Sequence, residues 1–68
     1  MKFKVGDLVC IRPEWVREYE KIPVGIITGA YPETPTAHGG HSVDVYWLDE
    51  GKVYDREDTR ALMVLNES

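Results

Sequence analysis

The sequence predicts a mainly β fold, a five-stranded antiparallel barrel with one short helical turn after the first strand. Three observations support this prediction. Short segments alternate apolar and polar residues with the period of a strand, turn residues separate these segments, and no helix of crossover length stands between them. With 68 residues, the chain makes a single domain, residues 1–68, that hides only about 60% of the surface of its unfolded form. We therefore expect function on the surface or in a shallow groove.

The first predicted strand lies between Lys4 and Pro13. Its apolar residues take alternate positions, as in a half-buried strand: Val5, Val9 and Ile11. Pro13 ends the strand because it cannot donate to a ladder. The single cysteine, Cys10, cannot form an internal disulfide, and its place in an apolar segment predicts a small buried side chain.

A short helical segment is predicted over residues 14–21. It is rich in helix formers, and Trp15 and Tyr19 lie four residues apart, on one side of a helix. One or two helical turns are not stable alone. We therefore expect the segment to lie against the sheet and to bury Trp15 there as a cap on the barrel.

The second predicted strand spans residues 24–29. A loop is expected over residues 30–41, which contain two prolines and two glycines and show little periodicity. Twelve residues are long for a loop in so small a domain, which suggests a role for it. The Pro-x-x-Pro spacing of Pro32 and Pro35 indicates a stiffened, exposed connection.

A hairpin is predicted over residues 43–55. One face of its first strand is apolar and is assigned to the core: Val43, Val45 and Trp47. A three-residue loop, residues 49–51, with Gly51 in the left-handed conformation, brings Val53 to the same face. A two-residue turn would mix the two faces, so the longer loop is preferred.

The outer face of this hairpin carries aromatic and acidic residues. The predicted register pairs Tyr46 directly with Tyr54 and places Asp44 opposite Arg56. Such a tyrosine pair either binds a partner or only stabilises the sheet, by about 0.2–1 kcal/mol. A polar turn over residues 57–59 then leads to a last short strand over residues 62–65.

The order of these segments resembles the SH3-like group of small β-barrels, which includes Tudor and KOW-type domains, and the resemblance covers nearly the whole chain. Three stretches carry it: Gly6-Asp7-Leu8-Val9 at the opening turn, Gly25-Ile26-Ile27 in the second strand, and Asp58-Thr59-Arg60-Ala61-Leu62, where that group has a short 3₁₀ turn before its last strand. The pattern also resembles that of small bacteriophage proteins.

The resemblance implies a non-enzymatic protein-interaction or assembly module. SH3-like domains use an aromatic patch for proline-rich peptides, and Tudor domains use a cage of aromatic and acidic residues for methylated lysine or arginine. An aromatic and acidic outer face therefore predicts a protein or peptide partner. The candidate partner-binding residues are Trp15, Tyr19, Tyr31, Tyr46, Tyr54 and Asp44.

The alternative function is that of a nucleic-acid or ribosome-associated KOW or Tudor-like barrel. Five cations interleave with Trp15 and Tyr19 near the N-terminus: Lys2, Lys4, Arg12, Arg17 and Lys21. The net charge of −4 opposes binding of a polyanion. Residues 1–21 carry five positive and four negative charges, whereas residues 22–68 carry three positive and eight negative charges.

No enzymatic activity, metal or cofactor is expected. His38 and His41 lie three residues apart, but a zinc site needs four ligands and the only thiol lies in a predicted strand. Cys10 among aliphatic residues lacks the electropositive setting of a nucleophile. A cluster of carboxylates is interpreted as a solvated acidic face: Asp49, Glu50, Asp55, Glu57 and Asp58.

The chain has no apolar segment near the ~20 residues that span a bilayer, and no signal peptide is recognised. A single cysteine fits a reducing compartment. We therefore expect a soluble cytoplasmic protein, in the cytoplasm of the host cell if a phage encodes it, with no membrane partner. An exposed edge strand would allow it to form a homo-oligomer.

Overall fold

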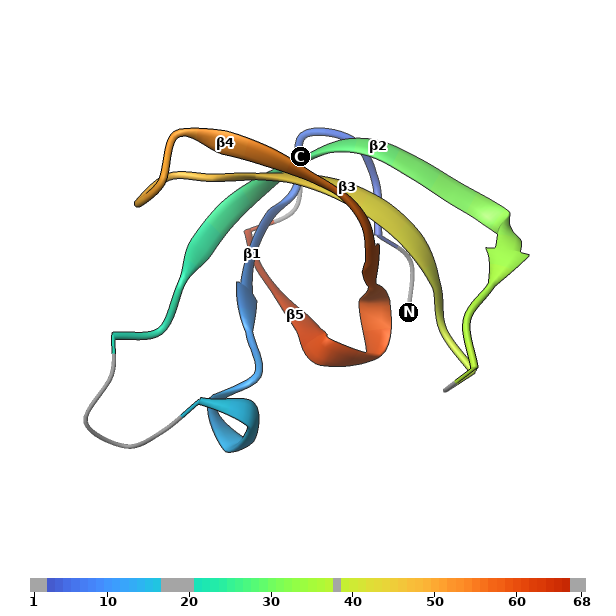
Figure 1. Ribbon diagram of the computed structural model, residues 1–68, viewed down its shortest axis with the longest axis horizontal. Helices are drawn as coiled ribbons and strands as arrows, with labels where there is room; N and C mark the ends of the chain where they lie inside the picture. Colours follow the sequence, from blue (N-terminus) through green and yellow to red (C-terminus); the bar gives the residue numbers. More distant parts are fainter. Residues whose placement is uncertain (1–2, 17–20, 38, 67–68) are drawn as a thin grey trace.

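The computed structural model describes residues 3–16, 21–37 and 39–66, which form five antiparallel strands in one open sheet (Figure 1). The strands are β1 (Leu8–Ile11), β2 (Val24–Pro35), β3 (His41–Trp47), β4 (Lys52–Asp58) and β5 (Leu62–Asn66), in the order β4-β3-β2-β1-β5. Two 3₁₀ turns, η1 (Pro13–Trp15) and η2 (Thr59–Ala61), follow β1 and precede β5. The prediction of a mainly β, antiparallel fold is confirmed. Within the described residues no helix is long and apolar enough to cross a membrane.

The sheet curls around a core on its concave face. In Figure 1, β1 and β5 lie beneath the arc of β2, β3 and β4. The buried apolar side chains that pack together there are Phe3, Val9, Ile27, Val43, Val45, Trp47 and Leu62. The inward direction predicted for Val43, Val45 and Trp47 is therefore confirmed. Val53 does not join them, contrary to the prediction: it lies on the edge strand β4 and is 50% exposed.

The β3–β4 hairpin closes with a different register from the predicted one. Gly51 has a φ of +67°, as expected, but the turn contains four residues, 48–51, because Leu48 leaves the ladder. Trp47 therefore pairs with Lys52, Tyr46 with Val53, and Val45 with Tyr54. The direct pairing of Tyr46 with Tyr54 is wrong. Paired residues share a face of a sheet, so Tyr46 lies on the convex face and Tyr54 on the concave one.

Bulges bend the central strands. The β2–β3 register shifts between Ile27 and Gly29, and the β3–β4 register shifts beside Asp44, where Arg56 adopts a φ of +63°. An extra residue in one strand increases its local twist and bend. Asp44 does stand across from Arg56, as predicted, and its Oδ1 accepts a hydrogen bond from the Arg56 N–H at 3.2 Å.

A close approach of β2 to β3 requires glycine at position 25. Gly25 pairs with Trp47. A Cβ atom on Gly25 would lie 2.5 Å from Val45 Cγ1 and 2.9 Å from Trp47 Cε3, which is well inside normal contact distance. The absence of a side chain there leaves room for the indole of Trp47, which packs in the core.

The opening turn before β1 is held by a buried aspartate. Asp7 is fully buried, its Oδ2 accepts a hydrogen bond from the Lys4 N–H at 2.8 Å, and its own N–H donates to the Lys4 carbonyl at 3.0 Å. Val5 lies in this turn and is 57% exposed, so the prediction that it shares the apolar face of the first strand is wrong. The predicted burial of Cys10 is confirmed.

Two other predicted segments differ in extent. Residues 30–35, expected in a loop, continue β2; Ala30 packs against the core and residues 31–35 are exposed. The predicted helix after β1 is a single 3₁₀ turn over residues 13–15, and residues 17–20 lie outside the described residues. The last strand and the 3₁₀ turn before it occur as expected.

Candidate functional site

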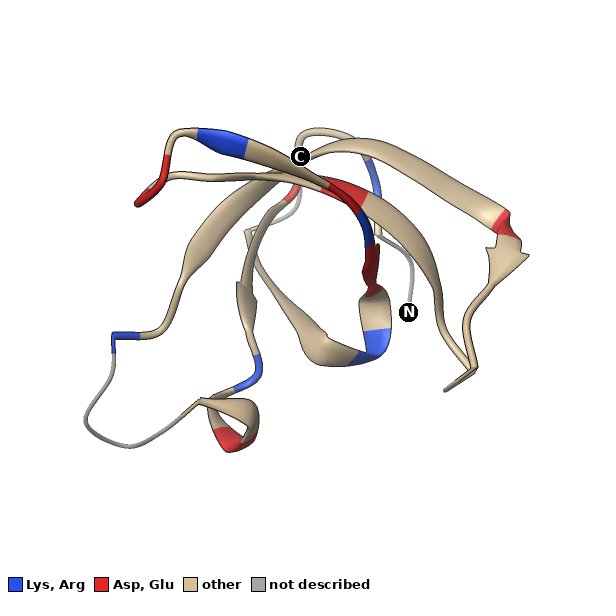
Figure 2. Ribbon diagram, in the orientation of Figure 1, with Lys and Arg blue, Asp and Glu red and all other residues tan. Residues whose placement is uncertain are grey.

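The concave face opens beside the hairpin into a pocket with aromatic walls and acidic edges. This acidic pocket has a volume of about 220 Å³, and its lining residues are Ile11, Pro23, Trp47, Asp49, Glu50, Tyr54 and Glu57. They come from β1, the segment before β2, β3, the hairpin turn and β4. Among the described residues, three carboxylates and no lysine or arginine line it, so its field favours a cation. Figure 2 shows the acidic residues at the tip of the hairpin.

Tyr54 is oriented by the hairpin turn. Its hydroxyl donates a hydrogen bond to Glu50 Oε1. This hydrogen bond and the charge of Glu50, with burial and the charge of Glu57, raise the pKa of Tyr54 above its usual value. The neutral phenol is thus favoured, and Tyr54, which is 42% exposed, lines the acidic pocket. The indole of Trp47, which is 5% exposed, also lines it.

The convex face carries a second aromatic and acidic group, at the β2–β3 bulge. The hydroxyl of Tyr31 donates to Asp44 Oδ2 at 2.6 Å, and this bond together with the charge of Asp44 raises the pKa of Tyr31. Tyr46 is exposed two residues further along β3, on the same face. The structure therefore brings together three of the predicted partner-binding residues, Tyr31, Asp44 and Tyr46, and separates them from Tyr54.

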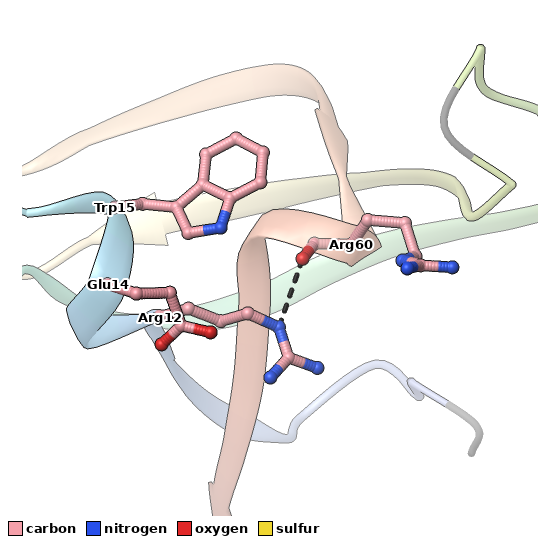
Figure 3. A pocket seen from close by; sticks show the side chains of 4 residues that line it. All are labelled: Arg12, Glu14, Trp15 and Arg60. Atoms are coloured by element: carbon pink, nitrogen blue, oxygen red, sulfur yellow. Dashed lines mark hydrogen bonds between the residues drawn. The ribbon is translucent and has the colours of Figure 1, made fainter.

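A groove of opposite charge lies at the same, C-terminal end of β1, where Arg12 directly follows Ile11 of the acidic pocket. This basic groove has a volume of about 470 Å³ and is lined by Arg12, Glu14, Trp15 and Arg60 (Figure 3). Trp15 is 58% exposed, so the prediction that it is buried against the sheet is wrong. The reason is that η1 ends at Trp15 and buries none of its residues. Tyr19, the other aromatic residue predicted for this segment, lies outside the described residues.

The two arginines meet because β1 pairs with β5. The Arg12 N–H donates to the Ala61 carbonyl at 2.9 Å, and the Arg12 Nε donates to the Arg60 carbonyl at 3.0 Å. Both arginines also line an adjoining cavity of about 310 Å³ with Phe3, Gly39, Gly40, His41 and Thr59. Of the other cations predicted for nucleic acid, Lys4 and Lys21 are exposed, and Lys2 and Arg17 lie outside the described residues.

The contacts of His41 are with residues that hold the fold together. Its ring lies edge-on to Phe3, with ring centroids 6.2 Å apart, and its backbone N–H donates to Thr59 Oγ1 at 3.0 Å. His38 lies outside the described residues. Within the described ranges, no three His, Cys, Asp or Glu side chains are grouped so that they could hold a metal ion. Burial raises the pKa of the Cys10 thiol, which opposes formation of a thiolate.

Sequence reasoning missed both cavities for identifiable reasons. The acidic pocket depends on Tyr54 facing inward, which follows only when the hairpin turn has four residues. The basic groove depends on Arg12 meeting Arg60, forty-eight positions later, and only the pairing of the first and last strands brings them together. The available signal was a charged residue next to each of these two strands: Arg12 directly follows the first strand, and Arg60 lies shortly before the last one.

Comparison of the chain with models of protein families, with curated proteins and with solved structures found no match.

Proposed function

We propose that this chain is a non-enzymatic protein-interaction module that holds a cationic side chain of its partner, a lysine or an arginine, in the acidic pocket. One observation carries this proposal: Trp47 and Tyr54 form aromatic surfaces of a cavity whose charged lining residues, Asp49, Glu50 and Glu57, are all acidic. An aromatic face attracts a cation through its quadrupole, and the carboxylates add Coulomb attraction of the same sign.

The fold supports an SH3-like assignment. A single domain of five antiparallel strands, with the 3₁₀ turn η2 directly before the last strand, is what the resemblance to that group implies. Within the group, Tudor domains hold methylated lysine or arginine among aromatic and acidic residues. The acidic pocket supplies both residue types, so a methylated cation is the form of ligand that we favour.

The size of the acidic pocket suits one side chain and not a whole small molecule. At about 220 Å³, it is smaller than the roughly 300–1,000 Å³ typical of cofactor and drug sites. It is also open, so the partner's backbone would remain outside, against the hairpin. Affinity would then be modest, since exposed cation–π contacts are worth about 0.5–1 kcal/mol each.

The test is a titration of the isotope-labelled protein with three short peptides that differ only at a central lysine: unmodified, trimethylated and acetylated. The indole N–H signal of Trp47 reports occupancy of the acidic pocket. We expect the trimethylated and unmodified peptides to shift this signal and the acetylated peptide to bind about 2- to 30-fold more weakly, because it has lost its charge.

Three variants locate the contact. Glu57→Gln and Tyr54→Leu should weaken binding of the trimethylated peptide, whereas Tyr46→Leu, the matched change on the convex face, should leave it unchanged. Thermal unfolding establishes that each variant is folded. Equal binding of the acetylated peptide would contradict cation recognition. Loss of binding in Tyr46→Leu alone would move the partner to the convex face of Tyr31, Asp44 and Tyr46.

A further inference from the structure

The basic groove is a local exception on an acidic chain. The net charge is −4, yet two arginines and one glutamate line this groove, and the same two arginines line the adjoining cavity without an acidic residue. Figure 2 shows both cationic positions, at the end of β1 and on η2, away from the acidic hairpin tip. The function proposed for the acidic pocket does not explain why two arginines lie together here.

Among the residues that the structure describes, both guanidinium groups keep donors that make no hydrogen bond. Arg12 is anchored through its Nε, which donates to the Arg60 carbonyl at 3.0 Å, and its Nη groups make no hydrogen bond to any residue in the described ranges. Arg60 is bound through its backbone, its N–H donating to Asp58 Oδ1 at 2.9 Å. Its side chain runs past Gly39, where a Cβ atom would lie 3.7 Å from the Arg60 Nη1. Free Nη donors on a fixed arginine are suited to phosphate or carboxylate oxygens.

Trp15 adds a flat apolar surface to these donors. In Figure 3 its indole lies across the basic groove from Arg12 and Glu14. The ring is 58% exposed, although an exposed indole leaves a large apolar area in water. A simple anion would use the arginines and leave this ring without a contact. A ligand that joins an anion to a planar ring would use both.

We propose that the basic groove binds a nucleotide unit, with its base stacked on Trp15 and its phosphate on the guanidinium of Arg12. Arg60, whose guanidinium points away from that of Arg12 in Figure 3, adds positive charge at the edge of the groove. Glu14, the one acidic lining residue, can accept a hydrogen bond from a base N–H or a ribose hydroxyl, so its presence fits a nucleotide better than a bare phosphate. The volume of about 470 Å³ lies within the roughly 300–1,000 Å³ of small-ligand sites.

The bound nucleotide is either a free mononucleotide or one unit of a short single strand. A duplex is disfavoured, because it places many phosphates against a surface whose net charge is negative and hides the base faces that Trp15 would stack on. The adjoining cavity, which shares both arginines, offers room for a neighbouring unit of a strand. This function is independent of the proposed binding of a cationic side chain, since no described residue lines both sites.

The experiment titrates the labelled 68-residue chain with adenosine monophosphate, adenosine, inorganic phosphate and a single-stranded tetranucleotide, and follows the indole N–H signal of Trp15. We expect adenosine monophosphate to bind more tightly than adenosine or phosphate alone. Trp15→Ala should weaken its binding about 5- to 100-fold, the range measured for loss of one stacked base. Tighter binding of the tetranucleotide would identify a single strand as the source, and equal binding a free nucleotide.

Charge-matched variants separate a site from general attraction. Arg60→Gln should weaken binding, whereas Lys52→Gln, which removes the same charge from β4, should not. Glu57→Gln in the acidic pocket should leave nucleotide binding intact while it weakens binding of the lysine peptides, so the two proposals fail separately. Equal losses in Arg60→Gln and Lys52→Gln, full binding by Trp15→Ala, or no shift of the Trp15 signal at millimolar nucleotide would overturn the proposal.

Discussion

The acidic pocket and the basic groove each combine a tryptophan with charged side chains, yet the two indoles have opposite surroundings. Trp47 is 5% exposed, packs in the core and reaches the acidic pocket with only part of its ring. Trp15 is 58% exposed and stands on a 3₁₀ turn that buries no residue. A tryptophan in a sequence can therefore be a core residue or an exposed surface residue. In this protein one tryptophan of each kind lines a cavity.

Truncating each indole gives the sharpest measure of that difference. Trp47→Ala should lower the free energy of unfolding by about 3–5 kcal/mol, because it removes the largest core side chain and leaves a cavity. A chain of this length has only about 3–10 kcal/mol in total, so much of the variant should be unfolded. Trp15→Ala should stay within about 0.5 kcal/mol of the parent. Urea denaturation followed by circular dichroism measures both, and similar losses would contradict the assignment of Trp15 to the surface.

A buried hydroxyl, that of Thr59, lines the cavity that adjoins the basic groove. Thr59 is buried on η2, and its Oγ1 accepts the His41 N–H at 3.0 Å. Thr59→Val keeps the shape but removes this acceptor, which should cost about 1–3 kcal/mol because a backbone donor loses its partner. Thr59→Ser keeps the hydroxyl and should cost less. Thermal unfolding ranks the two variants, and an equal loss in both would assign the effect to packing.

Local pattern sufficed for the strands and for much of the core. Alternation placed Val9, Val43, Val45 and Trp47 in the core, and the turn preference of glycine placed Gly51 in the left-handed conformation. These features depend only on residues that are close together in the sequence, so the sequence alone was enough to predict them.

The candidate sites depended on features that local pattern does not encode. Leu48 follows Trp47 directly and is itself apolar, and only its exposure in the turn shows that the hairpin register differs by one residue. That one residue moves Tyr54 from the convex to the concave face. The contact of Arg12 with Arg60 depends on the β1–β5 pairing, which is long-range. The exposure of Trp15 ran against the usual burial of a large aromatic ring, and such exceptions are where binding sites are sought.

The ionisation of Tyr54 gives the smallest effect and the most direct comparison of the two cavities. Its hydrogen bond to Glu50, the charge of Glu50, burial and the charge of Glu57 raise its pKa above the ordinary 10.0. The neutral phenol is thus favoured in the folded state. Its contribution to stability is complete below pH 10.0 and is lost as the pH rises through the raised value in the folded protein. Glu50→Gln removes the charge and should lower the pKa of Tyr54, as followed by the chemical shifts of its ring.

Ligands should move this pKa in a way that tells the cavities apart. A lysine peptide in the acidic pocket places a positive charge beside Tyr54, which favours the phenolate and should lower the pKa of Tyr54. A nucleotide in the basic groove is anionic and lies outside the lining of the acidic pocket, so it should leave the titration nearly unchanged. An equal shift with both ligands would mean that they share one site. In that case the separation of the two cavities by charge, and both assignments that rest on it, would be wrong.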